Sequence, residues 1–396
     1  MKWSGSEAAR KITQTTTSRA IQGITIFLVV VGTITIAGDL YFLSNIRKSL
    51  KKHHTKTFVS TVSTHDSTSL HNRTVVANLL REAGAMVTDE SKLPTLAQIA
   101  DLYGPRPVIL GLEHCEHFRN TVPASERMLG AAGMFSTGTN LVTHLLKRNC
   151  YIPERAEKYG LETATKEQLG MRWQVPWGKH TPADYKIKHA TEKAQLINKD
   201  YILPCVTIRS PWRWMQSMCK NPYTARWPHA SICPHLVVNS SQLSRQWNPV
   251  TVKYGAGIEN YTSLVHLWIE WYDQYARLVL DDEVVENHAT SYPVLIIRME
   301  DLIFYTQETV TQICQCTGGV IYAEKPFEYV VESAKKDSPG HDTSVGLTEA
   351  WIKYSKPLQP RAGFVQEDYL AGIDALNHDD RFGLMKLLQY HHPPSN

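Results

Sequence analysis

The hydrophobic pattern predicts regular structure mainly beyond residue 105. There, short apolar runs alternate with longer segments in which apolar residues recur at helical spacing. We predict strands at residues 108–112, 128–134, 201–209 and 294–298. We predict helices at residues 140–147, 212–220, 261–280, 307–316 and 381–390. Strands that are apolar throughout and separated by helices are typical of a parallel sheet covered on both faces, so we expect one α/β domain over residues 105–396.

An uncharged segment near the N-terminus is long enough to cross a membrane. Residues 20–38 contain no Asp, Glu, Lys or Arg, and at about 1.5 Å per residue they span a bilayer core of about 30 Å. A cleaved signal peptide has a shorter apolar core and a small-residue cleavage site. We therefore expect an uncleaved transmembrane anchor at 20–43 after a cytosolic tail at 1–19. A buried helix or a removed signal is the alternative.

Residues 44–104 are interpreted as a stalk and linker. Residues 44–80 are rich in Lys, His, Ser and Thr and poor in apolar residues, a composition that buries too little surface to fold by itself. A short helix is expected at 95–102, before the Gly104-Pro105 breaker.

Charge is distributed unevenly along the chain. Residues 1–56 carry nine Lys or Arg and two acidic residues, a net charge of +7, whereas the whole chain carries +4. The remaining residues therefore carry −3. A near-neutral body argues against a nucleic-acid-binding protein, whose binding domain is basic. Because Lys and Arg flank both sides of the anchor, they do not fix its orientation.

Sequons and cysteines bear on the compartment. Triplets of the form N-x-[ST] begin at Asn72, Asn239 and Asn260. They permit N-glycosylation if the body is lumenal. The seven cysteines lack the paired spacing of a zinc site. Cys205 is expected to be a core thiol, whereas Cys219 and Cys233 can form a disulfide in an oxidising lumen or stay reduced in the cytosol.

The sharpest local signal is a strand–loop–helix pattern. A strand of small residues leads into Phe135-Ser136-Thr137-Gly138-Thr139, and a helix is expected to begin near Asn140. In this context backbone N–H groups and the helix N-terminus bind a phosphate. Gly138 allows an unusual backbone angle or a close approach, and Thr137, Thr139 and Asn140 add polar donors. An ordinary Gly-bearing turn is the alternative.

This loop differs from that of the nucleoside triphosphatases. Gly133 and Gly138 have the spacing of G-x-x-x-x-G-K-[ST], but Thr139-Asn140 replaces the Lys-[ST] pair. That Lys binds the β- and γ-phosphates, and the Ser or Thr holds Mg²⁺. The sequence therefore argues against a kinase or ATPase. It favours a ligand that lacks a triphosphate and needs no metal.

A second phosphate-binding candidate follows the strand at 201–209. This strand ends on Arg209, Pro211 suits the first turn of a helix, and Ser217 lies on that helix. An Arg at the carboxyl end of a strand can bind a phosphate through two N–H groups, and the Ser217 hydroxyl can donate to the same anion. The alternative is a structural ion pair of Arg209 and a merely packed Ser217.

Together these segments resemble the sulfotransferases that use 3'-phosphoadenosine 5'-phosphosulfate (PAPS). Residues 136–140 are similar to the family's 5'-phosphosulfate loop, K-[ST]-G-[ST]-[STN]. Arg209-x-Pro211 with Ser217 is similar to its R-x-P-x(5)-S element, which binds the 3'-phosphate. Residues 294–302 are similar to its vRyEDL element. The resemblance covers about residues 127–320, and the anchor and stalk resemble the type II Golgi members.

The resemblance implies a single P-loop-like domain that moves sulfonate from PAPS to an acceptor hydroxyl by in-line displacement. The expected acceptor is a carbohydrate, and no metal or nucleic acid is expected to take part. It also implies a single-pass type II protein of the Golgi with a lumenal, glycosylated catalytic domain.

One position departs from the family pattern. Ser136 stands where the family usually has a Lys or Arg that contacts the phosphosulfate. We expect Lys179 to be the catalytic cation and His180 the general base, because soluble members carry a Lys and a His in a comparable stretch. Neighbours on a strand point to opposite faces, so both can serve only from a loop. A solvated Lys-His pair is the alternative.

Arg361 is a further candidate for contact with the nucleotide. Soluble members use Arg-Lys-Gly near the C-terminus, and only Arg361 and Gly363 match here.

Two rival functions remain. A lumenal glycosyltransferase shares the anchor, stalk and body plan, but its metal-dependent members bring a D-x-D motif, which this sequence lacks. A catalytically inactive relative would bind the nucleotide without turning it over, and the neutral Ser136 keeps that alternative open.

Overall fold

The computed structural model describes residues 69–188, 197–227, 236, 250–255, 257–281, 291–334 and 345–396. These residues belong to one compact unit, Ser67–Asn396. The expected tail at 1–19 and anchor at 20–43, and residues Asn239 and Cys233, lie outside the described residues. Within the described ranges, no helix combines the length and the apolar character needed to cross a membrane.

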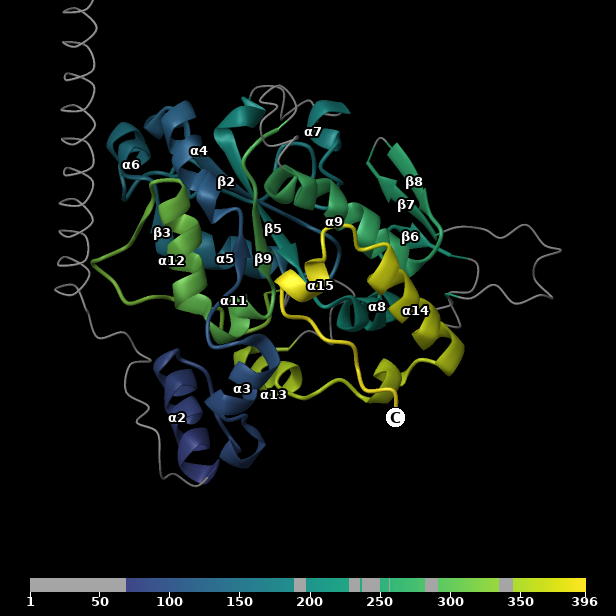
Figure 1. Ribbon diagram of the computed structural model, residues 1–396. Helices are drawn as coiled ribbons and strands as arrows, with labels where there is room; N and C mark the ends of the chain where they lie inside the picture. The colour runs from purple at the N-terminus through teal and green to yellow at the C-terminus, as the bar shows by residue number, and fades with distance from the viewer. Residues whose placement is uncertain are drawn as a thin grey trace, which may run out of the picture. The chain divides into compact units, whose positions relative to one another are not determined.

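The centre of the unit is a five-stranded sheet (Figure 1). Its strands, in the order β1-β9-β5-β2-β4, are Ile109–Leu110, Leu295–Arg298, Ile202–Ile208, Met128–Gly133 and Met171–Arg172. β9, β5, β2 and β4 run parallel, and β1 pairs antiparallel with β9. The prediction of an α/β fold with a sheet flanked by helices is confirmed. The sheet is mixed rather than purely parallel, because the first predicted strand runs the other way.

Helices cover both faces of this sheet. One face carries α4, α5 and α12, at Cys115–Thr121, Thr139–Asn149 and Thr306–Cys316. The short helix α6 (Pro153–Tyr159) lies against the turn at Ala124–Glu126. The other carries α8, α9, α14 and α15, at Pro211–Lys220, Leu264–Leu280, Gln366–His378 and Leu384–Leu387. Successive strand residues alternate between the two cores, as strand geometry requires. In β5, Val206 and Ile208 join α8 and α9, whereas Leu203 and Cys205 join α5 and α12.

The predicted stalk and linker needs correction from residue 69 onward. α2 (Ser69–Glu82) and α3 (Leu96–Tyr103) fold there, and Thr95 and Gln98 cap α3 reciprocally. Val76 and Leu80 are buried in a third core with α11 (Asp301–Phe304) and α13 (Leu347–Tyr354). The average composition of residues 44–80 did not indicate α2. A helix needs only one apolar face to fold when it packs against another surface.

Smaller elements complete the unit. A three-stranded antiparallel sheet is formed by β6, β7 and β8, at Ala225–Arg226, Val250–Tyr254 and Gly257–Tyr261. β3 (Cys150–Tyr151) pairs with β10 (Val320–Ile321). Single-turn helices lie at Glu90–Lys92, Leu112–His114, Ala124–Glu126, Tyr185–Lys188, Lys199–Tyr201 and Pro360–Gly363.

The helix expected at 381–390 is wrong in its extent. Only α15 forms there, because Gly383 takes a left-handed backbone angle (φ 64°) immediately before it. The Asp380 side chain accepts hydrogen bonds from the first two N–H groups of α15, Leu384 and Met385. The long helix in this part of the chain is instead α14.

Disulfides join elements far apart in sequence. Cys115 pairs with Cys316, and Cys150 pairs with Cys314. The sequence spacing did not suggest either pair. Cys219 is also disulfide-bonded, and its expected partner lies outside the described residues. The prediction of a buried Cys205 thiol is confirmed.

Candidate functional site

All the sequence-predicted site residues except Arg361 lie at or beside one edge of the main sheet. β4, β2, β5 and β9 are parallel, so their carboxyl ends share that edge. The segments that leave these ends begin at Trp173, Met134, Arg209 and Met299. In open α/β sheets ligands bind outside the carboxyl ends of the strands.

The loop between β2 and α5 has a strained backbone. Ser136 has a φ of 60° and Gly138 a φ of 89°. A Cβ at position 138 would lie 2.7 Å from Met299 Cγ, so the glycine permits a close approach to the segment after β9. Gly138 directly precedes the first residue of α5, Thr139. The first N–H groups of α5 have no partner within the helix, and a helix end of this kind can bind an anion.

Thr137 braces the loop from inside. Its side chain is fully buried, and its hydroxyl donates a 2.7 Å hydrogen bond to the Met134 carbonyl. It also lies 3.0 Å from the Thr207 hydroxyl on β5. The expected hydroxyl donor is thus engaged within the protein, and Thr137 would reach a ligand through its backbone. Thr139 is also buried.

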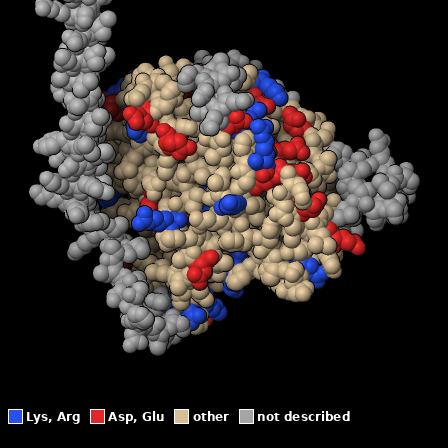
Figure 2. Space-filling view, viewed as in Figure 1, with Lys and Arg blue, Asp and Glu red and all other residues tan. Residues whose placement is uncertain are grey.

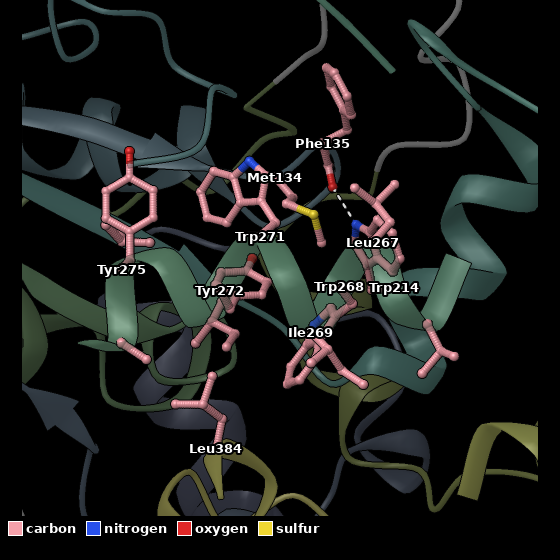
Figure 3. Packing of buried hydrophobic residues seen from close by; sticks show 14 of the residues in the cluster. Met134, Phe135, Trp214, Leu267, Trp268, Ile269, Trp271, Tyr272, Tyr275 and Leu384 are labelled. Carbon is pink, nitrogen blue, oxygen red and sulfur yellow. Dashed lines mark hydrogen bonds between the residues drawn. The ribbon is translucent and has the colours of Figure 1, made fainter. Parts of the chain in front are cut away.

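Phe135 is held from two directions. Its carbonyl accepts a 2.8 Å hydrogen bond from the Trp214 indole N–H, and this tryptophan lies in the aromatic core beside α9 (Figure 3). Its ring lies 4.6 Å from the His180 ring and stacks on Tyr223 at 5.1 Å. Phe135 therefore supports the loop and builds a row of three rings beside it. Its side chain was not expected to have this role.

Arg209 connects the loop to the second candidate segment. Its guanidinium is buried, with 4% of the residue exposed. Nη1 donates to the Ser136 carbonyl at 3.1 Å and to the Ser217 hydroxyl at 2.8 Å. Its Nε is buried without a hydrogen-bond partner. Leaving a buried charged donor without an acceptor costs free energy, so this N–H is a candidate donor to a bound ligand.

Further cations surround Arg209, and the sequence analysis missed them. The pKa of Lys353 is lowered by desolvation and then by repulsion from Arg209, Lys220 and Arg213. Arg209 and Arg213 both lie against the Tyr354 ring, at 5.2 and 5.7 Å. Arg209, Arg213 and Lys353 thus bring positive charge close together, and such a group of basic side chains attracts an anion. Lys353 lies on α13, and no local motif marks it.

Lys179 and His180 lie in a turn after β4. These neighbouring residues are therefore not held on opposite faces of a strand. The Lys179 ammonium donates to the Asn140 side-chain oxygen at 3.0 Å and lies 3.4 Å from the centre of the Trp173 ring. Only 6% of Lys179 is exposed. The structure thus brings a buried cation to the first turn of α5, beside the loop that lacks one.

His180 is oriented by the loop strand. Its Nδ1 lies 2.7 Å from the Gly133 carbonyl, which can only accept, so Nδ1 carries the proton. In the neutral ring the lone pair is then on Nε2. The backbone carbonyl of His180 accepts from the Trp271 indole on α9 at 3.0 Å. This arrangement fixes the tautomer that a general base needs.

The aromatic face of α9 supports several of these segments (Figure 3). Ser263 caps the helix by accepting from the His266 N–H. The Trp268 indole donates to the Arg209 carbonyl at 3.0 Å, and the Tyr272 hydroxyl donates to the Thr207 carbonyl at 2.8 Å. Buried Trp and Tyr side chains place their polar ends on acceptors. Here those acceptors are the backbone of the site.

Arg361 lies beside α8 rather than in the loop. Its backbone is left-handed (φ 51°), and its N–H donates to the Pro394 carbonyl. The next carbonyl, Ala362, accepts from Gln216 on α8 at 2.8 Å. Across the described ranges, no contact joins the Arg361 side chain to Arg209 or to residues 135–140.

The described residues contain no group of three or more His, Cys, Asp or Glu side chains suited to hold a metal. In the stretch from His114 to His117, Cys115 forms a disulfide.

On the face seen in Figure 2, basic and acidic side chains are interspersed, and no continuous basic stripe crosses it.

No protein-family model, curated protein or solved structure matches the chain.

Proposed function

We propose that this chain is a PAPS-dependent sulfotransferase with a P-loop-like catalytic domain, acting on a hydroxyl of a carbohydrate. One observation carries the proposal. The buried Arg209 guanidinium binds both the loop carbonyl of Ser136 and the hydroxyl of Ser217, and it retains an unsatisfied N–H. A glycine loop at a helix N-terminus and a buried, basic anion site are therefore neighbours. A nucleotide with a phosphate at each end of its ribose matches such a pair.

The donor nucleotide would use the two parts differently. The N–H groups of residues 135–140 and the start of α5 bind the 5'-phosphosulfate. Arg209 and Ser217 bind the 3'-phosphate, with Arg213 and Lys353 adding positive charge. These basic side chains attract the 3'-phosphate electrostatically. Arg361 is assigned only to the rim of this site, next to α8.

The transfer step follows from the positions of Lys179 and His180. The acceptor oxygen attacks sulfur, and a new S–O bond forms. The bond from sulfur to the bridging oxygen breaks, its electron pair stays on the 5'-phosphate, and 3'-phosphoadenosine 5'-phosphate (PAP) leaves. His180 Nε2 takes the acceptor proton and later releases it to water. Lys179, held by Asn140, stabilises the charge that develops on the bridging oxygen.

The chain organisation is proposed to be that of a type II Golgi protein. Residues 20–43 anchor it, residues 44–68 form a stalk shorter than first expected, and the body is lumenal. The disulfides within the body support an oxidising compartment, and Asn260 of the third sequon is exposed on β8. Glycosidase treatment of the expressed protein should increase its mobility. Unchanged mobility, with the body cleaved by protease from the cytosolic side, would refute this orientation.

Transfer of labelled sulfonate from PAPS to a panel of glycans tests the function directly. We expect labelled product from at least one glycan class, with equal yield in the presence of EDTA. Transfer of a sugar from a nucleotide sugar, lost with EDTA and restored by Mn²⁺, would favour the glycosyltransferase. PAPS binding without transfer to any hydroxyl acceptor would favour the inactive relative.

A further inference from the structure

Two non-glycine residues at the site share an uncommon backbone conformation, and their side chains meet. Ser136 has a φ of 60° and Tyr223, at the turn after α8, a φ of 55°. The Ser136 hydroxyl donates a 3.2 Å hydrogen bond to the Tyr223 hydroxyl, across 87 residues of sequence. Left-handed conformations of bulky residues are strained and persist only where the surroundings impose them. A strained pair at a candidate site therefore indicates a functional constraint.

The surroundings hold both residues. Arg209 Nη1 donates to the Ser136 carbonyl at 3.1 Å, and Arg226 Nη1 donates to the Tyr223 carbonyl at 2.6 Å. The Tyr223 ring stacks on Phe135 with an interplanar angle of 11°. The tyrosine is thus fixed in position and orientation, with its hydroxyl at the start of the loop. A residue that merely filled space would not need these restraints.

We propose that the Tyr223 hydroxyl, held in place by the hydrogen bond that it accepts from Ser136, donates to a sulfonate oxygen of the bound phosphosulfate. This inference rests on the proposed function. Since the Ser136 proton lies in the hydrogen bond to Tyr223, Tyr223 is the one of the two hydroxyls that keeps a proton to donate to a ligand oxygen. The Phe135 ring contacts both the His180 ring and the Tyr223 ring, so the proposed base and the tyrosine lie beside the same residue of the loop. A neutral tyrosine therefore supplies the contact that the uncharged Ser136 alone cannot.

Binding of PAPS and of PAP, which lacks the sulfonate, tests the pair without any acceptor. Tyr223→Phe removes the hydroxyl and keeps the stack on Phe135. We expect PAPS affinity to fall about two- to tenfold, the loss of one neutral hydrogen bond, with PAP affinity unchanged. Tyr159→Phe, on α6, is the matched control and should change neither affinity. Equal losses for PAPS and PAP, or no loss of PAPS affinity, would overturn the role of Tyr223 as sulfonate donor while leaving the proposed function intact.

A rescue experiment gives an independent readout. Ser136 already occupies the left-handed conformation without glycine, so Ser136→Lys adds a cation at an accessible backbone angle. We expect Tyr223→Phe to lower kcat as well, and Ser136→Lys in the same chain to restore much of that loss if Tyr223 takes the place of a loop cation. A Tyr223→Phe variant with unchanged kcat, or a double variant with no recovery, would contradict the inference. Wild-type protein that binds neither PAPS nor PAP would instead refute the proposed function, and the role of Tyr223 with it.

Discussion

The Lys179 ammonium donates a 3.0 Å hydrogen bond to the side-chain oxygen of Asn140, 39 residues earlier in the chain. This bond joins the turn after β4 to the first turn of α5. The ammonium also lies over the Trp173 ring. Since both partners are fixed, the buried charge is directed at the loop whose own position 136 is neutral. The site therefore has a preorganised cation from another segment.

Replacing Lys179 by Met should remove this charge and keep most of the buried side-chain volume. We expect kcat to fall about 10²- to 10³-fold, the scale for a preorganised electrostatic contact with developing charge. PAPS affinity should change much less, because the charge develops during transfer. Steady-state kinetics with labelled PAPS measures both. Lys166→Met, at an exposed lysine that contacts Tyr322, is the control. A rate within a few-fold of wild type would remove Lys179 from the mechanism.

His180→Asn distinguishes the proposed role of His180 as general base from its hydrogen bond to the Gly133 carbonyl. An Asn amide can still donate to the Gly133 carbonyl, as His180 Nδ1 does, but it offers no equivalent of Nε2. We expect kcat to fall about 10²- to 10⁴-fold, with nucleotide binding retained. If the variant lost PAPS affinity in proportion to its rate, His180 would be a binding residue and not the base.

Most of the central sheet could be predicted from the sequence, because buried parallel strands are apolar on both faces. The strands around Met128–Gly133, Ile202–Ile208 and Leu295–Arg298 follow this rule. α2 could not be predicted by composition, since Val76 and Leu80 are buried only against α11 and α13. The short edge strands also escaped detection. Their two residues pair in the fold but leave no periodic pattern.

Candidate site residues could be predicted where they lie close together in one short segment of the sequence. Arg209 and Ser217 lie eight residues apart, on a strand end and the helix that follows it, and their contact is present. Lys353 and Tyr223 come from elements distant in sequence, so no local motif could mark them. Thr137 shows that a motif position does not fix the role of a side chain. Its motif position suggested a ligand donor, but its hydroxyl is engaged by Met134.

Asp273 on α9 should make stability depend on pH. Burial, followed by repulsion from Asp380, raises its pKa to about 7, and its Oδ1 is buried without a partner. The unfolded pKa is about 3.9. Between these values the folded state binds the proton more tightly, so this group's contribution to stability decreases as pH rises from about 4 to about 7.

Asp273→Asn should therefore be more stable than wild type at pH 8, by about 1–3 kcal/mol. The difference should shrink toward pH 4.5. Urea unfolding of both proteins at the two pH values measures it. A difference that is the same at both pH values would show that Asp273 titrates normally in the folded state.

The Cys150–Cys314 disulfide should stabilise the body considerably, since it joins β3 to α12 across 164 residues. Replacing both cysteines by Ala should lower the free energy of unfolding by about 2–5 kcal/mol, as for other native disulfides. Denaturant unfolding checks this value. Reducing agent should destabilise wild type more than the double variant. Equal stability of wild type and double variant would mean that the bridge is absent in solution.

The central claim is that PAPS binds with its 3'-phosphate on Arg209 and Ser217. Calorimetric titration with PAPS and with adenosine 5'-phosphosulfate, which lacks this phosphate, tests it most directly. A charge-assisted bond contributes about 1.5–3 kcal/mol, so Arg209→Ala should weaken PAPS binding by roughly ten- to more than a hundredfold. Ser217→Ala should lose about 0.5–1.5 kcal/mol. The Arg209→Ala protein should keep only the weak preference for PAPS that Ser217, Arg213 and Lys353 supply. A folded Arg209→Ala protein that still strongly preferred PAPS would contradict the account.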